Sequence, residues 1–179
     1  MINDETSAWE CINKLHQMGP KQIVITSTNL SREGSMVGFF SDNINDIRGS
    51  INVPELVDTR LITDENKKGF VEFTGTGDMF AACLCGHSGK ALLTSARILY
   101  TAFYIGITLT RILVEKPFHE AIGCALEAVR VTLEKTLSTV SMETDKIKKE
   151  DIELNQVAAR REIMNSENAD WTRFVKLIK

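Results

Sequence analysis

The stretch Thr74-Gly-Thr-Gly-Asp-Met-Phe80 decides how this chain is interpreted. It follows the short apolar run Phe70–Phe73 and opens a stretch of small and apolar residues, Ala81–Gly86. A strand, a turn with two glycines and the start of a helix, in this order, make a site for a phosphate group. The free N–H groups of the first helical turn point at the ligand, and the helix dipole favours negative charge there.

The residues inside this stretch add chemistry to the cradle. Gly75 and Gly77 allow positive φ and close approach of the backbone, and Asp78 places one carboxylate beside the cradle. A phosphate site with an adjacent base indicates phosphoryl transfer. The alternative is an ordinary N-cap, with Thr or Asp before a buried helix, and four residues alone do not decide between the two.

Composition bounds the class of protein. A chain of 179 residues is long enough for one domain with a core, and its 43% apolar and 25% charged residues are ordinary for a soluble globular protein. A net charge of −3, without a basic stripe, gives no case for nucleic-acid binding. The polar start is no signal peptide. The four cysteines form no CxxC pair, which fits buried thiols in a reducing cytoplasm: Cys11, Cys83, Cys85 and Cys124. The scattered histidines are expected at the surface or at helix caps: His16, His87 and His119.

The first part of the chain predicts half of an α/β unit. Apolar residues at helical spacing predict a helix over Thr6–Met18, capped by Asp4 or Thr6. The β-branched run Gln22–Thr28 predicts a buried parallel strand, and Ser35–Ser41 predicts a second strand that turns back.

Later segments are assigned in the same way. The polar stretch Asn29–Gly34 is expected to be a loop, Ser41–Pro54 a surface excursion, and the tail from Asn165 irregular or briefly helical. Strands are expected over Leu56–Ile62 and Phe70–Phe73. One helix is expected to start near Asp78, and two more to span Pro117–Ser141 and Ile152–Met164.

One segment stands apart from this pattern. Between Arg97 and Arg111 the run Ile98–Thr110 carries no charge. A membrane span needs roughly 20 apolar residues. A buried or misplaced apolar helix is therefore favoured over a transmembrane one, and a membrane partner is not expected.

Three features together resemble a pyridoxal kinase of the ribokinase-like superfamily. They are Met18-Gly-Pro-Lys-Gln-Ile-Val-Ile-Thr-Ser-Thr28, the turn Thr74-Gly-Thr-Gly-Asp-Met-Phe-Ala81, and Glu153-Leu-Asn-Gln-Val-Ala-Ala-Arg-Arg-Glu-Ile163. The turn alone is shared by sugar, hydroxymethylpyrimidine and pyridoxal kinases, and the other two features favour pyridoxal kinase. The resemblance implies a three-layer α/β/α fold.

The chain departs from the family in two ways. The family's chain is considerably longer, so residues 1–179 are expected to be the C-terminal portion of a single kinase domain. The front of the fold, with the vitamin pocket and a Thr-Pro-Asn-x-x-Glu motif, has no counterpart here. Residues 88–115 look like an apolar insertion where the family has a short connection.

The resemblance implies ATP-dependent phosphorylation of the 5′-hydroxymethyl group of pyridoxal. Asp78 would bind this hydroxyl and act as the general base. Gly75, Thr76 and Gly77 would offer N–H groups to the γ-phosphate as an anion hole, and the Thr76 hydroxyl would also contact ATP.

Other residues are carried over from the family as nucleotide contacts. Thr26 and Ser27 would contact ATP, with Thr26 also near a monovalent cation, K⁺ or Na⁺, although a plain strand end explains them too. Gly69, Phe70 and Val71 would lie along the nucleotide, and their alternative is an edge strand. The resemblance also implies that the reaction needs Mg²⁺ or another divalent cation. It further implies a homodimer.

Two other functions stay open. One is a related kinase for a sugar or hydroxymethylpyrimidine. The other is a truncated isoform or pseudo-kinase without catalysis, which binds nucleotide or a full-length partner at best.

Overall fold

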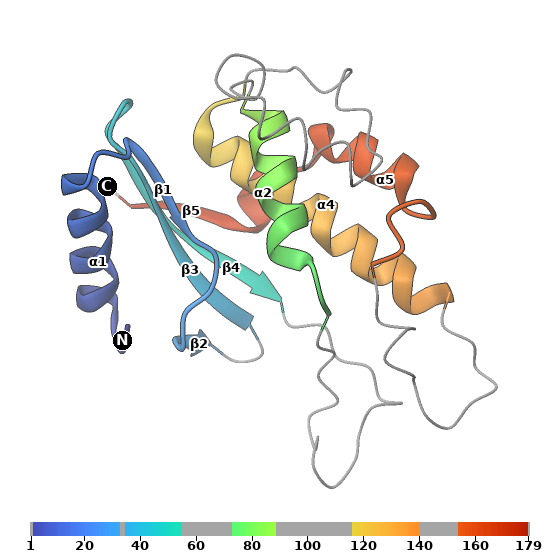
Figure 1. Cartoon of the computed structure of the whole chain (residues 1–179), viewed down its shortest axis with the longest axis horizontal. Coiled ribbons are helices and arrows are strands. Elements are labelled where there is room, and N and C mark those ends of the chain that lie inside the picture. The colour runs from blue at the N-terminus through green and yellow to red at the C-terminus, as the bar shows by residue number, and fades with distance from the viewer. Residues whose placement is uncertain (1, 33–34, 55–72, 89–115, 140–153, 179) are drawn as a thin grey trace, which may run out of the picture. The chain divides into compact units, whose positions relative to one another are not determined.

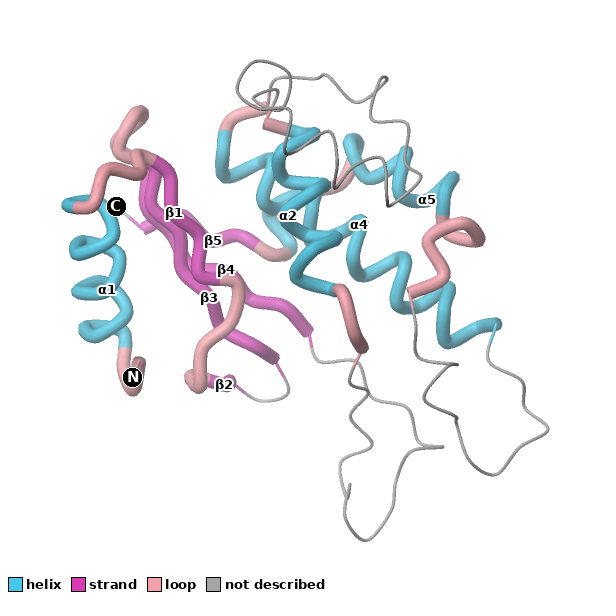
Figure 2. Tube along the Cα trace, viewed as in Figure 1, coloured by secondary structure: helices cyan, strands magenta, loops and turns pink. Residues whose placement is uncertain are grey.

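The computed structural model describes residues 2–32, 35–54, 73–88, 116–139 and 154–178 (Figures 1 and 2). These residues fall into two compact units. The first comprises Met1–Glu55, Phe118–Gly123 and Asp170–Lys179, and the second comprises Leu56–Pro117 and Cys124–Ala169. Both units are therefore built from segments that are distant in sequence.

A five-stranded sheet forms the first unit. Its order is β1-β3-β4-β5, β2 pairs with β3, and every pairing is antiparallel. A tight turn joins β3 to β4, and Asp46 in this turn has a φ of 54°. The strands are β1 (Gln22–Ile25), β2 (Ser31–Arg32), β3 (Ser35–Asp42), β4 (Ile47–Pro54) and β5 (Val175–Ile178).

Helix α1 (Glu5–Gln17) covers one face of this sheet, as Figure 1 shows. Asp4 caps it: its side chain accepts the N–H of Ser7 at 2.7 Å, and Ser7 Oγ accepts the N–H of Asp4 in return. Ala8 and Ile12 are buried against the sheet, and Trp9 meets Phe39 edge-on with ring centroids 5.4 Å apart. The predicted helix and its Asp4 cap are confirmed.

The other face of the sheet packs against the start of α4 (Phe118–Thr139). Phe39 and Phe40 are neighbours on β3, so their side chains point to opposite faces. Phe40 contacts Phe118 with ring centroids 6.3 Å apart and an interplanar angle of 68°. Helical residues thus cover both faces of the sheet within the first unit, as a three-layer fold requires.

Helices make up the described part of the second unit. They are α2 (Thr76–His87), the rest of α4, α5 (Arg160–Asn165) and the short 3-10 helix η5 (Ser166–Asn168). Helix α2 buries Met79, Phe80 and Cys83, and burial raises the pKa of the Cys83 thiol to about 12. The helices predicted near Asp78 and over Pro117–Ser141 are confirmed.

Several predictions were wrong. β1 is not parallel to its neighbour, because the link to β3 is too short for a crossover and makes an antiparallel pair. Ser41–Pro54 is no surface excursion, since it contains β4, whose glycine and polar residues pair with two strands. The chain end forms β5, helix α5 is shorter than Ile152–Met164, and the expected loop Asn29–Gly34 contains β2.

Some predictions fall outside the described residues. They are the strand Leu56–Ile62, the strand Phe70–Phe73 except for Phe73, and the insertion 88–115 except for Ser88. Among the helices that the structure does describe, none has the length and apolar character needed to cross a bilayer.

Candidate active site

The turn Gly75–Asp78 starts helix α2 without a side-chain cap. Gly75 is the N-cap and has a left-handed conformation, with φ 87° and ψ 4°. The N–H of Met79 donates to the Gly75 carbonyl at 3.0 Å as the helix begins. No side chain of the described residues accepts a hydrogen bond from this end of the helix. The alternative of an ordinary Thr or Asp cap is therefore wrong, and the first N–H groups of the helix are not capped by a side chain of the described residues.

The surroundings of the two glycines differ. At Gly77, no atom of the described residues lies within 4 Å of the place that a Cβ atom would occupy. At Gly75, the Cδ1 atom of Leu154 lies 3.9 Å from that place. An apolar side chain therefore lies beside Gly75, whereas the side-chain position at Gly77 is open among the described residues.

The charges at this end of α2 are a partial positive charge from the helix and the carboxylate of Asp78. The helix dipole places partial positive charge at the turn. Asp78 lies in the first turn and is exposed, as is Gly77, while Thr76 is half-buried. The carboxylate is therefore open to solvent, as a general base for a substrate hydroxyl would need to be.

His87 lies at the opposite end of α2 and is buried, contrary to the expected surface or cap position. Its side chain is 1% exposed, and Nε2 lies 3.3 Å from Ser166 Oγ. Because Ser166 donates its proton to the Ile163 carbonyl at 2.7 Å, the proton between the two side chains belongs to Nε2. Nδ1 has no partner among the described residues. Burial, with the nearby Lys116 charge, lowers the pKa of His87 to about 4, so the ring is neutral and structural.

Thr26 and Ser27 follow the end of β1 and are exposed. The next residue ties them to β3: the N–H and the hydroxyl of Thr28 donate to the Val37 carbonyl at 2.9 and 2.8 Å. Gly38 permits this close crossing, because a side chain there would meet the carbonyl oxygens of residues 25 and 26. These two candidate residues belong to the first unit, whereas Gly75–Asp78 belong to the second.

The remaining candidates lie outside the described residues. They are Gly69, Phe70 and Val71, which stay predictions. Within the described ranges, no group of three or more His, Cys, Asp and Glu side chains could hold a metal ion. Sequence reasoning did not find that Leu154 lies next to the turn, because nothing in the spacing of the two segments indicates that they come together.

The chain shares the ribokinase-like α/β fold of solved kinase structures. In sequence, half of the chain is similar to a pyridoxal kinase. It is 38% identical over 92 residues to the pyridoxal kinase of Ovis aries, an alignment covering 50% of this chain and 28% of that protein. No family model matches the chain.

Solved structures show the same likeness at the level of the fold. A pyridoxal kinase from Leishmania donovani, in complex with ADP and ginkgotoxin, has a TM-score of 0.60 and 18% identity. It is matched over 99% of this chain and 46% of its own. A pyridoxal kinase from Entamoeba histolytica has a TM-score of 0.53 and 17% identity over 99% and 45% of the two chains. The chain thus spans less than half the length of these kinases.

Proposed function

We propose that this chain carries the phosphate-binding turn and the general base of an ATP-dependent pyridoxal kinase. The reaction is transfer of the γ-phosphoryl group to the 5′-hydroxymethyl group of pyridoxal, in vitamin B6 salvage. The observation that carries the proposal is the uncapped start of α2 at Gly75, beside the exposed Asp78. The relation to the pyridoxal kinase of Ovis aries supports this choice of acceptor.

Each residue of the turn has a role in this proposal. The N–H groups of Gly75, Thr76 and Gly77 stabilise the charge on the transferred phosphoryl group, and the Thr76 hydroxyl contacts ATP. Asp78 aligns the acceptor hydroxyl and takes its proton. A positioned base of this kind contributes about 10²–10⁴-fold to the rate.

The nucleotide and ions are proposed on similar grounds. The ADP complex of the Leishmania donovani enzyme supports ATP as the donor. Mg²⁺ is usually held by one or two carboxylates plus the phosphates of the substrate, so it would bind together with ATP. Thr26 and Ser27 would contact the nucleotide, with a monovalent cation near Thr26, and Gly69, Phe70 and Val71 would lie along it. A homodimer in the cytoplasm completes the proposal.

The experiment measures nucleotide binding and turnover separately on residues 1–179. ADP is titrated by calorimetry, and pyridoxal 5′-phosphate formation is followed with ATP, Mg²⁺ and pyridoxal. The proposal expects both signals, with turnover reduced about 10²–10⁴-fold by Asp78→Asn and ADP binding retained. Unchanged turnover in Asp78→Asn would refute the assignment of the base. Binding without turnover in the wild type would favour the non-catalytic isoform, and a substrate panel would identify a related sugar or hydroxymethylpyrimidine kinase.

A further inference from the structure

The turn at Gly75 is supported by a segment far away in the sequence. A glycine in the left-handed region has no side chain to lock its conformation, so its neighbours must hold it. Among the described residues, only Leu154 comes within 4 Å of the side-chain position at Gly75, with Cδ1 at 3.9 Å. Leu154 is itself half-buried. Its methyl group therefore lies beside the turn from which α2 starts.

A buried hydroxyl on α4 fixes the main chain beside Leu154. The N–H of Asn155 donates to Thr136 Oγ1 at 2.9 Å, and the Thr136 hydroxyl donates to the Thr132 carbonyl at 2.8 Å. Thr136 is 1% exposed. Asn155 Oδ1 accepts the N–H of Ala158 at 3.0 Å, which closes the following turn. The main chain next to Leu154 is thus fixed by two hydrogen bonds of Asn155, one through its N–H and one through its side chain.

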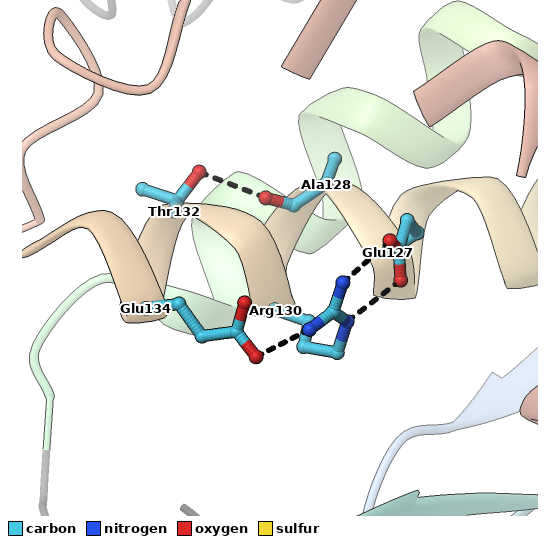
Figure 3. Close-up of polar contacts among 5 residues, drawn as sticks. All are labelled: Glu127, Ala128, Arg130, Thr132 and Glu134. Carbon is cyan, nitrogen blue, oxygen red and sulfur yellow. Dashed lines mark hydrogen bonds and ion pairs between the residues drawn. The ribbon is translucent and has the colours of Figure 1, made fainter. Parts of the chain in front are cut away.

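This hydroxyl belongs to a row along one side of α4. The Thr132 hydroxyl donates to the Ala128 carbonyl at 2.8 Å, one turn before Thr136 repeats the pattern (Figure 3). The ion pairs of Arg130 with Glu127 and Glu134 lie on the opposite side of the helix in Figure 3. The threonine side is buried. The Thr136 oxygen donates its proton within the helix and can still accept a hydrogen bond from another segment of the same unit.

We infer that Thr136 and Leu154 are positioning residues for the phosphate-binding turn. The Thr136 hydroxyl holds Asn155, and Leu154 then keeps Gly75 in the conformation that presents the N–H groups of α2. The value of this arrangement for nucleotide binding rests on the proposed function, whereas its effect on the turn does not.

Two substitutions at Thr136 form a matched pair. Thr136→Val keeps the shape and removes the hydroxyl, and Thr136→Ser keeps the hydroxyl. Amide hydrogen exchange in residues 1–179 reports on the turn through Met79, whose N–H donates to the Gly75 carbonyl. The N–H of Ser88, which donates to the Leu84 carbonyl at 3.0 Å, serves as an internal control. Thr136→Val is expected to speed exchange at Met79 about three- to tenfold, leaving Ser88 unchanged. Thr136→Ser is expected to match the wild type at both amides.

A second variant and a second measurement keep the two hypotheses separate. Leu154→Ala removes the contact without touching the Thr136 hydrogen bonds, and it should also speed exchange at Met79 alone. ADP titration of the same variants should show a dissociation constant raised about three- to tenfold in Thr136→Val and Leu154→Ala. Unchanged exchange at Met79, or equal acceleration at Met79 and Ser88, would overturn the inference. Selective acceleration in a protein that does not bind ADP would support the inference and count against the proposed function.

Discussion

Phe40 on β3 lies opposite Gly49 on β4, and its ring fills the space that a side chain at position 49 would need. The carbonyl oxygen of Lys176 on β5 borders the same space. The position therefore requires glycine because of packing, while its φ lies in the ordinary range.

Gly49→Ala is expected to destabilise the sheet by about 1–3 kcal/mol, since the added methyl group forces the Phe40 ring out of place. Urea unfolding would measure the loss. The double variant Gly49→Ala with Phe40→Leu should lose less than the sum of the single changes, because a smaller side chain at 40 relieves the clash. Additive losses would contradict the packing explanation.

Asp42→Asn is expected to destabilise the β3–β4 hairpin by about 1–3 kcal/mol. The Asp42 carboxylate accepts the N–H of Ile44 at 2.9 Å and side-chain N–H groups from Gln22 and Asn45 at 3.0 and 2.8 Å. An amide has one acceptor oxygen and would turn N–H groups toward donors. Urea unfolding at neutral pH measures the effect, and Asp46→Asn, in the same turn but exposed, should stay within about 0.5 kcal/mol of the wild type.

The same carboxylate predicts a loss of stability in acid. Burial acts to raise the pKa of Asp42, but the hydrogen bonds from Asn45, Gln22 and Ile44 bring it below its ordinary value. A lowered pKa in the folded state means that the stabilisation is complete above the ordinary value of 3.8 and is lost as the pH falls through the lower, folded-state value. Asp42→Asn should not show this component of acid unfolding.

His87→Gln is expected to flatten the pH dependence of stability between about pH 6.5 and 4. The unfolded chain takes up a proton on His87 in this range, whereas the buried ring stays neutral, so the wild type loses up to about 3 kcal/mol as the pH falls. Glutamine can donate to Ser166 but does not titrate. Urea midpoints of both proteins across this range give the comparison, and parallel curves would show that His87 is not the titrating group.

Gly77→Ala is expected to change stability and ligand binding in opposite directions. Position 77 lies within α2 without positive φ, so alanine should stabilise the helix by about 0.5–1 kcal/mol. The same methyl group would enter the space proposed for the phosphate and weaken ADP binding. Thermal unfolding and calorimetry on one preparation test both effects. A variant that is more stable and binds ADP like the wild type would argue that Gly77 only starts a helix.

Local patterns predicted α1, α2 and α4, but not the extent of α5. The spacing of apolar residues and the Asp4 cap located α1, and the glycine turn located the start of α2 within two residues of the expected Asp78. The sequence also indicated that the strand over Ser35–Ser41 turns back, although it predicted β1 as a parallel strand. These features depend on residues close together in the chain, which is where propensity and capping act.

The sheet partners could not be predicted in the same way. β4 contains Arg48, Gly49, Ser50 and Asn52, a polar composition that suggested a surface excursion. It forms a strand because β3 and β5 pair with both of its edges. Long-range pairing of this kind overrides local propensity. For the site, the motif located Asp78 and the glycines, but the proximity of Leu154 to Gly75 arises only when two distant segments fold together.

The pairing of Ile51 with Val175 has a consequence for synthesis of the chain. β5 leaves the ribosome long after β4, so one edge of β4 stays open while the intervening residues are made. An open edge is a site for pairing with other chains, and slow long-range pairing prolongs its exposure. A premature stop before Val175 would leave this edge open permanently. Such a product should aggregate during translation or be retained by chaperones, even though every residue of the glycine turn is present.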